Sequence, residues 1–275
     1  MNKKYKKIIL YIVLLIVCLV LLFPLYWLVN TSVQTNEEIY SVPPQLFPKS
    51  NPIPQYIDYI TTYPILRWLL NSTIASLSTA LLSVLLGLFA AFSLSRYNFK
   101  GKIIFIFLIL MTQMLPPAFL IIPQYFLLTK IRIIDTYLAL IFLYTAVATP
   151  ITTWFLKGFI DGVPEEIEDA AKIDGCNNVN MMFRIVFPLV LPGIIATGAW
   201  SFIISWNDFV IANTVINSDS LWTSSVGLSS HIGAYYIDWN SIMIGGILTA
   251  LPTLILFMIF QRYITSGLTA GGVKG

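Results

Sequence analysis

The sequence contains little charge. Asp, Glu, Lys and Arg make up 11% of the 275 residues, against about 25% in a typical soluble domain, while 57% of the residues are hydrophobic. This composition excludes an ordinary soluble protein, and it excludes a disordered one because disordered chains are poor in apolar residues. The net charge of +3 is small and scattered, so no nucleic-acid-binding surface is expected. We therefore expect an integral protein of the lipid bilayer.

Residues that carry covalent or metal chemistry are scarce. There are two cysteines, Cys18 and Cys176, and one histidine, His231. The cysteines belong to separate segments in a reducing setting, so no disulfide is expected. His231 has no cysteine or second histidine near it in the sequence, and we expect a solvated loop residue rather than a metal ligand or a general base. The chain is therefore predicted to be no enzyme and to bind no metal or cofactor itself.

Long uncharged stretches dominate the chain. A helix needs roughly 20 mostly apolar residues to cross about 30 Å of hydrocarbon. Six uncharged stretches are long enough, namely 8–36, 68–95, 103–129, 136–156, 185–207 and 239–261. A seventh, 220–237, is rich in hydroxyl side chains that are costly to bury in lipid, so we expect a loop there. The prediction is an all-α membrane protein with six transmembrane helices.

Lys and Arg are unevenly distributed between the connecting segments. If the N-terminus lies inside, twelve of the 16 fall on the cytoplasmic side, where such residues are enriched. Both termini are therefore predicted to be cytoplasmic. The expected parts are a cytoplasmic N-terminus (1–7), a first transmembrane helix acting as a retained signal anchor (8–33), an extracytoplasmic Pro-rich loop (34–67), five further helices (within 68–263) and a cytoplasmic tail (264–275).

Prolines mark interruptions. The loop 34–67 has six prolines within 22 residues, which we expect to exclude a regular helix and to favour extended or turn structure. Within the third uncharged stretch, Pro116 and Pro117 are the best candidates for a functional break in a helix. Ordinary packing irregularity is the alternative.

Six of the 13 acidic residues lie within 14 residues, between the fourth and fifth spans. Acids directly after Pro164 are typical of a helix start, since they face the positive end of the helix dipole. Asp174 followed by Gly175 is typical of a helix end, because glycine adopts the left-handed conformation there. A short cytoplasmic helix is predicted between these points, with Ala170 and Ala171 small enough to let another surface approach. A solvated acidic linker helix is the alternative.

The residues of this helix also carry a family resemblance. The run from Val163 to Gly193, with VPEEIEDAAKIDGC and then FRIVFPLVLPG, resembles the EAA loop of ABC importer permeases of the type I architecture. The ending QRYITSGLTAGGVKG at 261–275 is similar to that of the carbohydrate, maltose-permease-like branch, as are Trp206–Phe209 and Ile134–Tyr137. The matches extend from roughly the second helix to the last residue.

Two positions depart from the family pattern. The glutamate of the motif is Asp169, beside which Glu168 is expected to share its role, and the usual small residue after Asp-Gly is Cys176. The resemblance implies a coupling loop, at about 160–187, that docks on a cytoplasmic ATPase. The residues that it assigns to ATPase coupling are Glu165, Glu166, Glu168, Asp169, Ala170, Ala171, Asp174 and Gly175.

The resemblance also implies a multi-pass protein of the cell membrane of a prokaryote, and it implies partners. They are a second permease subunit of different sequence, two copies of the ATPase and an extracytoplasmic solute-binding protein. This sequence has no Gly-x-x-x-x-Gly-Lys-Ser/Thr phosphate loop, so ATP and Mg are expected on the ATPase chain.

Polar and aromatic residues near the outer end of the fifth span suit a sugar, whose faces are apolar and whose edges are hydroxyls. Candidate substrate contacts are Gln113, Trp206, Asn207, Asp208 and Asn213. The alternative is that Asp208 marks the outer end of the fifth helix and that the tryptophans form an interfacial belt. In the resembled family the following loop reaches the docked binding protein, and the candidate contacts are Ser218, Asp219, Trp222, Thr223 and Tyr235.

The expected function is the permease subunit of an ATP-driven, binding-protein-dependent importer that forms half of the pathway for a sugar or oligosaccharide. A permease of the same kind for glycerol phosphate, an amino acid or a peptide is an alternative. A stand-alone secondary transporter is another, but it needs ion-coupling charges within the spans, and apart from Asp208 these are missing.

Overall fold

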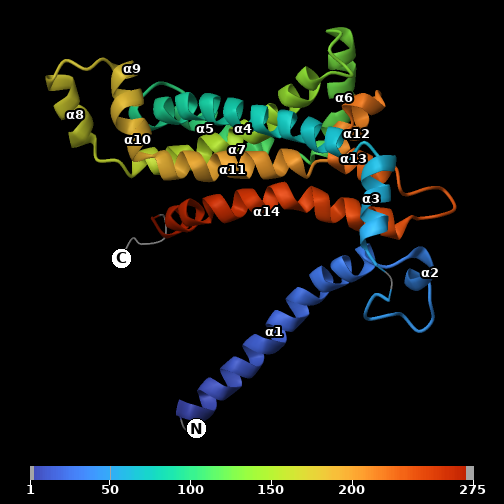
Figure 1. Ribbon diagram of the computed structural model, residues 1–275. Helices are drawn as coiled ribbons and strands as arrows, with labels where there is room; N and C mark the ends of the chain where they lie inside the picture. The colour runs from blue at the N-terminus through green and yellow to red at the C-terminus, as the bar shows by residue number, and fades with distance from the viewer. Residues whose placement is uncertain (1–2, 50, 271–275) are drawn as a thin grey trace. The chain divides into compact units, whose positions relative to one another are not determined.

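The structure is a computed structural model that describes residues 3–49 and 51–270 (Figure 1). These residues form helices joined by loops and turns, without a β-strand, and a single antiparallel bridge joins Ile232 and Ile237. The predicted all-α class is therefore confirmed for the described part of the chain. The backbone divides into two compact units, Met1–Leu66 with Gly227–Leu251 and Arg67–Val226 with Pro252–Gly275, which are called unit 1 and unit 2 below.

Unit 1 begins with α1 (Lys3–Ser32), whose apolar side chains are exposed, as lipid-facing side chains are. The short α2 (Asn36–Ile39) follows, and Thr35 and Glu38 form a capping box at its start. The first half of α14 (Trp239–Ala270) also belongs to unit 1. Of the predicted end segments, residues 1–2 and 271–275 lie outside the described residues.

The prediction that prolines exclude a regular helix from the loop 34–67 is wrong. This loop contains α3 (Ile53–Thr62), which has ten residues. Pro54 lies in the first turn of α3, where the missing N–H of proline costs no hydrogen bond, and Pro64 lies beyond its end. The prolines therefore delimit the helix instead of preventing it.

His231 is not the solvated loop residue that we expected. Its side chain is buried in unit 1, where the Tyr59 hydroxyl and His231 Nε2 lie 3.2 Å apart and the Tyr63 ring packs edge-on against the imidazole. Gly245 on α14 makes room for this cluster, because a Cβ atom there would lie 2.2 Å from the Tyr59 hydroxyl. Burial lowers the pKa of His231 below its usual 6.5, against the opposing effect of Asp238.

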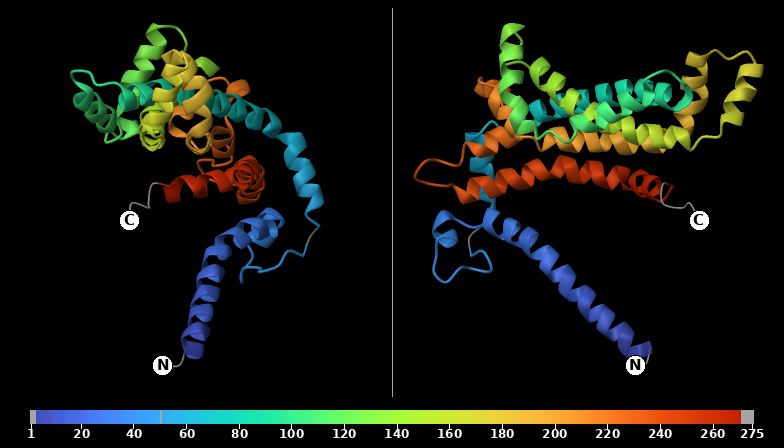
Figure 2. Two further views of the ribbon diagram at one scale, coloured as in Figure 1. Left: turned by 90° about the vertical axis from the view of Figure 1, so that its left-hand side faces the viewer. Right: turned by 180° about the vertical axis from the view of Figure 1, so that it is seen from behind.

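The long helices of unit 2 are α4 (Ile65–Arg96), α7 (Tyr137–Asp161) and α11 (Leu191–Trp206), which lie side by side in both figures that show the whole chain (Figures 1 and 2). Buried apolar side chains fill the space between α7 and its neighbours. The remaining helices of unit 2 are α5 (Lys102–Thr112), α6 (Pro117–Lys130), α8 (Glu165–Ile173), α9 (Asn178–Met181), the π-helical turn Met182–Val186, α10 (Phe187–Leu189), α12 (Val210–Val215) and the 3-10 turn Asp219–Leu221; α13 (Ser224–Ser229) continues into unit 1.

Four helices in the described residues are long and apolar enough to cross a membrane by themselves. They are Lys6–Ser32, Ile65–Arg96, Tyr137–Asp161 and Trp239–Gln261. A fifth candidate is the pair Val179–Leu189 and Leu191–Trp206, which is bent by 80° at Val190. The seventh uncharged stretch, 220–237, contributes no spanning helix, as predicted.

The third predicted span is interrupted. Its first part, α5, ends at Thr112, and its second part, α6, starts at Pro117, so the helix is broken at the predicted proline pair. With 11 and 14 residues, each part is shorter than the roughly 20 residues that a complete crossing needs. Six uninterrupted spans are therefore not what the chain forms.

Candidate coupling site

The predicted acidic helix is present as α8, which starts directly after Pro164. It ends before Asp174, and Gly175 follows with a φ of +84°, the left-handed conformation that favours glycine. Within unit 2, α8 lies at one end of the long helices, whereas α6 and α12 lie at the other end (Figures 1 and 2). The caps read from the sequence thus correspond to the observed helix ends.

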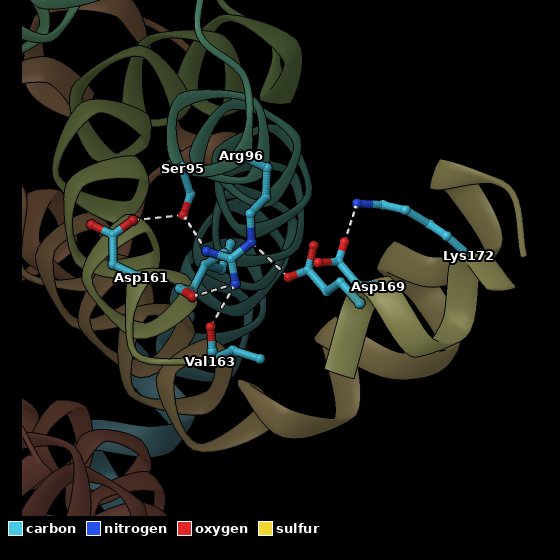
Figure 3. A network of polar contacts seen from close by, with 8 residues as sticks. Ser95, Arg96, Asp161, Val163, Asp169 and Lys172 are labelled. Atoms are coloured by element: carbon cyan, nitrogen blue, oxygen red, sulfur yellow. Dashed lines mark hydrogen bonds and ion pairs between the residues drawn. The ribbon is translucent and has the colours of Figure 1, made fainter. Parts of the chain in front are cut away.

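A buried ion pair attaches α8 to α4. Arg96, the last residue of α4, donates from Nε to Oε1 of Glu168 over 2.6 Å, and the two side chains are 10% and 3% exposed. The Nη2 atom of Arg96 donates to the carbonyl oxygens of Ile160 and Val163, each at 2.9 Å (Figure 3). Since Ile160 belongs to the last turn of α7, the guanidinium also lies at the negative end of that helix. One side chain thereby contacts α7, α8 and the link between them.

Ser95 extends the network to the end of α7. Its hydroxyl donates to Oδ1 of Asp161 over 2.5 Å and accepts a hydrogen bond from Nη1 of Arg96 over 3.1 Å (Figure 3). Asp161 also pairs with Lys157, one turn earlier on α7, at 2.5 Å. Next to these polar contacts, buried apolar side chains of α4, α7, the link before α8 and the segment after α8 form one cluster, which includes Leu88, Phe92, Leu156, Ile160, Val163, Met182 and Val186.

The residues assigned to coupling fall on two sides of α8. Glu168 and Ala171 are buried against the rest of unit 2, with 2% and 6% of their surface exposed. The other six are exposed, namely Glu165, Glu166, Asp169, Ala170, Asp174 and Gly175. Glu168 and Asp169 consequently occupy different environments and do not form one interchangeable pair of acids, and the two alanines point in different directions.

Asp169 belongs to the exposed side. It pairs with Lys172 at 2.9 Å within α8 (Figure 3), and this hydrogen bond raises the pKa of Lys172. Exposed pairs of this kind contribute little to stability. The outer side of α8 thus presents carboxylates and Ala170 to the surroundings, while its inner side is held by the Arg96 network.

Sequence reasoning missed Ser95 and Arg96. Arg96 entered the prediction only as one of the cytoplasmic positive charges, and its partner lies 72 residues further along the chain. The available signal was the position of Arg96 as the first charge after a long apolar stretch, on the membrane side predicted for the acids as well.

The candidate substrate contacts are divided between a buried and an exposed group. Trp206 is 1% exposed and stacks on Phe202 at 5.3 Å between ring centroids, so it forms neither an interfacial belt nor an open surface. Asp208 follows the end of α11, accepts from the Tyr144 hydroxyl at 3.2 Å and caps the start of α12. Asn207 and Asn213 are exposed.

Gln113 is the remaining candidate substrate contact. It follows the last residue of α5, at the proline break, and its side chain is exposed. Its Nε2 atom lies 3.5 Å from the carbonyl oxygen of Val147 on α7. The break therefore places a polar side chain against the middle of a long helix.

Asp135, which directly precedes the N-cap of α7, holds the loop after α12 by hydrogen bonds. The backbone N–H groups of Asn217 and Ser218 each donate to Asp135 Oδ1 at 2.9 Å, and the Ser218 hydroxyl donates to the other oxygen. Burial alone would raise the pKa of Asp135, but these hydrogen bonds lower it below its usual value. Asp135 has a φ of 60°, a left-handed conformation that is uncommon outside glycine.

Asn71 of α4 holds the same loop further along. Its Nδ2 atom donates to the carbonyl oxygens of Ser220 and Trp222 at 3.0 and 2.8 Å, and its Oδ1 accepts from the Tyr137 hydroxyl at 2.6 Å. Thr223 is buried and Trp222 half-buried, whereas Asp219 and Tyr235 are exposed. Of the candidate contacts for a binding protein, Ser218, Trp222 and Thr223 thus contribute to the fold, and Asp219 and Tyr235 face outward.

The sequence was compared with known families and proteins. Residues 83–269 match the family described as binding-protein-dependent transport system inner membrane component. The inner membrane ABC transporter permease protein YcjP of Escherichia coli is 33% identical over 259 residues, which cover 94% of this chain and 92% of YcjP. The sulfoquinovosyl glycerol transport system permease protein SmoH of Agrobacterium fabrum is 32% identical over 254 residues, which cover 92% of this chain and 89% of SmoH.

The fold is also similar to a solved structure. A chain from the crystal structure of a bacterial ABC transporter involved in the import of the acidic polysaccharide alginate superimposes with a TM-score of 0.82. The match covers 96% of this chain and 98% of the other at 15% sequence identity, a level at which the likeness concerns the fold alone.

Proposed function

Because the chain belongs to the family of binding-protein-dependent transport system inner membrane components, we propose that it is the permease subunit of an ATP-driven importer for a sugar or oligosaccharide. The match over residues 83–269, which include α8, is the observation that carries this proposal. The trehalose/maltose transport system permease protein MalG of Thermococcus litoralis is 29% identical over 98% of both chains, which supports a sugar. Glycerol phosphate, an amino acid or a peptide is the alternative cargo.

We further propose six membrane crossings with both termini in the cytoplasm of a prokaryote. Four are the single long helices, the bent pair around Val190 is the fifth, and α5 with α6 forms a sixth that is broken at Pro116. In this arrangement α8 is cytoplasmic, on the side where most Lys and Arg residues lie. The tolerated proline break fits a helix whose free carbonyls are satisfied by neighbouring protein.

The partners that we propose are those of the family to which the chain belongs. A second permease of different sequence completes the pathway, two ATPase copies carry ATP and Mg, and a binding protein docks outside. We assign the ATPase contact to the exposed side of α8, with Glu165, Glu166 and Asp169 as its charges, since carboxylates on a short helix attract basic side chains across an interface. Ala170 follows Asp169 on the same exposed side, and its small side chain permits close approach.

The function is tested with the complete importer in liposomes, using maltose, trehalose, galactobiose, arabinotriose and diacetylchitobiose as probes. Uptake of a sugar that requires ATP and the binding protein would support the proposal. Uptake of glycerol 3-phosphate, an amino acid or a peptide alone would establish the alternative cargo, and uptake of a sugar without the ATPase would contradict the proposed class.

The ATPase contact is tested by charge reversal in the same liposomes. The double variant Glu166→Lys and Asp169→Lys should lower sugar-stimulated ATP hydrolysis and uptake together, because the ATPase would no longer dock. Glu37→Lys, at an exposed acid of α2 outside the proposed contact, is the matched control. Full activity of the double variant would place the contact elsewhere.

We assign the binding-protein contact to Asp219 and Tyr235, the outward-facing members of the predicted set. Tyr235 is fully exposed, which suits a docking residue. Replacing Ser218–Thr223 as a whole would also release the loop from Asp135 and Asn71, so single substitutions are the sharper test. Tyr235→Ala should raise the concentration of binding protein needed for half-maximal ATP hydrolysis, and an unchanged concentration for both Tyr235→Ala and Asp219→Ala would exclude this assignment.

For the substrate path we retain Gln113, Asn207, Asp208 and Asn213, whose polar atoms suit sugar hydroxyls. Trp206 is left in a packing role. Asn207→Ala and Asn213→Ala should raise the sugar concentration for half-maximal uptake without changing ATP hydrolysis in the absence of sugar. If neither variant alters the dependence of uptake on sugar concentration, these amides do not contact the cargo.

A further inference from the structure

Arg96 connects three helices of unit 2 through one side chain. It ends α4, donates to the last turn of α7 at Ile160 and to the link at Val163, and forms an ion pair with Glu168 of α8. We propose that Arg96 is a positioning residue for coupling, which fixes α8 to α4 and α7 so that a movement imposed on α8 carries both helices with it. This inference rests on the proposed function of α8 as the ATPase contact.

The other ion pairs show why this one has a special position. Three ion pairs occur among the described residues. Lys157–Asp161 lies within α7 and Asp169–Lys172 lies within α8, so neither can transmit a movement from one helix to another. Arg96–Glu168 joins different helices, and it is the most buried of the three. Because the pair is buried, removal of either partner leaves the other as an uncompensated buried charge.

The chemistry of arginine explains why this residue type is needed. The planar guanidinium offers five N–H donors in a fixed fork, and here they reach a carboxylate, a hydroxyl and two carbonyl oxygens at once. A lysine would keep the positive charge but has a single nitrogen, which cannot span the same four acceptors. The conservative variant Arg96→Lys therefore separates charge from geometry.

The space around the pair indicates that hydrogen bonds, and not close packing, hold α8 at this point. A cavity of about 230 Å³ lies beside it and is lined by Phe92, Arg96, Tyr97, Glu165, Glu168, Lys172 and Met181. A smaller or neutral side chain at 96 would leave this space open without a steric clash. The link to α7 is short, since α7 ends at Asp161 and α8 begins at Glu165. Without Arg96, α8 would keep the covalent link and the buried Ala171 but would lose its ion pair with α4.

The test uses the complete importer in liposomes and measures uptake and ATP hydrolysis in the same preparation. We expect Arg96→Gln and Glu168→Gln to lower the amount of solute taken up per ATP by about 2- to 30-fold, the usual range for residues along a coupling route. The uptake per ATP of the double variant should be no lower than that of the more impaired single variant, because both changes break the same connection. Arg96→Lys should recover part of the loss. Lys100→Gln removes an exposed charge nearby and should leave the ratio unchanged.

A purely structural role would change the yield of folded importer but not the uptake per ATP of what remains, so an unchanged ratio in Arg96→Gln and Glu168→Gln would overturn the proposal. Additive losses in the double variant would also overturn it, because the two residues would then act separately. If Arg96→Gln fails to accumulate, Arg96→Lys and Glu168→Gln decide by the same ratio. Failure of the wild-type importer to take up any probe would instead refute the proposed function, which keeps the two failures distinct.

Discussion

Gly193 on α11 permits a close approach to Phe159 of α7, and its replacement gives a sharp test of the packing in unit 2. A Cβ atom at this position would lie 2.5 Å from Cγ and Cδ2 of the Phe159 ring on α7. Carbon atoms of real side chains do not approach so closely, and Cγ is too near the backbone for the ring to turn away. Gly193→Ala must therefore displace either Phe159 or the helix axis.

The expected size of the effect follows from two opposing contributions. Overpacking in a filled core costs about 1–3 kcal/mol, while exchanging glycine for alanine within a helix gains about 1 kcal/mol. Gly193 is the third residue of α11, where the gain in helix propensity is smaller because the first turn is less constrained. We expect Gly193→Ala to lower the free energy of unfolding by about 1–2 kcal/mol.

The matched control lies five residues further along α11. A Cβ atom at Gly198 would lie 3.5 Å from Val84 Cγ2, which is an ordinary contact, so Gly198→Ala should be neutral or stabilise by up to about 1 kcal/mol. Unfolding by sodium dodecyl sulfate, followed by circular dichroism, measures both variants. In the pair Gly193→Ala with Phe159→Ala, which removes Cγ as well as the ring, the loss should be smaller than the sum of the single losses. If both glycine variants behave alike, or if Phe159→Ala brings no relief, the close packing of α7 and α11 is refuted.

Three further predictions concern Asp135, His231 and Asn71. The hydrogen bonds that lower the pKa of Asp135 stabilise the fold at pH values above 3.8, the usual pKa of an aspartate, and this stabilisation should be lost as the pH falls through the lowered pKa. The unfolding temperature of Asp135→Asn should lack that pH dependence, and a pH profile identical to that of the wild type would contradict the prediction. His231 binds its proton less readily when folded, so stability should rise with pH up to about its usual 6.5, and His231→Gln should flatten the unfolding temperature between pH 5 and about 7. Asn71→Ala should lower the free energy of unfolding by about 1–3 kcal/mol, since it leaves the carbonyl oxygens of Ser220 and Trp222 without this donor. It should also make the loop at Ser220 more sensitive to proteolysis, and protection equal to that of the wild type would contradict the role of Asn71 in holding the loop.

Two of the predicted spans correspond to single helices of unit 2. The second uncharged stretch corresponds to α4 within a few residues, and α4 ends at Arg96, the first charge after that stretch. The fourth stretch starts with α7 but ends five residues before it, because Lys157 lies inside the helix. The third and fifth stretches did not form continuous helices. An uncharged stretch indicates that its surroundings are apolar. Pro116 and the turn at Val190 change the direction of the backbone within such a stretch, without any change in polarity. Hydropathy alone has no information on such bends.

The proline loop and His231 show a second limit. Pro54 and Pro64 were read as helix breakers, although a proline in the first turn or beyond the end of a helix breaks nothing. His231 was expected in water because it lies in a predicted loop without a cysteine or second histidine near it. In the structure it is buried beside Tyr59 and Tyr63, which lie more than 160 residues earlier. Burial depends on such distant neighbours, which local composition does not reveal.

The acids of α8 illustrate how far local sequence determines a site. Pro164, the clustered carboxylates and Gly175 are local signals, and they located the helix correctly. Which carboxylate faces inward depends on where α4 ends, and this is a tertiary property. Because Arg96 selects Glu168, the adjacent Asp169 remains on the exposed side with Ala170. A helix of nine residues can thereby offer charge to a partner on one side while a single acid on the other side ties it to its own bundle. The physical basis is the difference between a buried ion pair, in which either partner alone is strongly unfavourable, and exposed charges, which remain available for an interface.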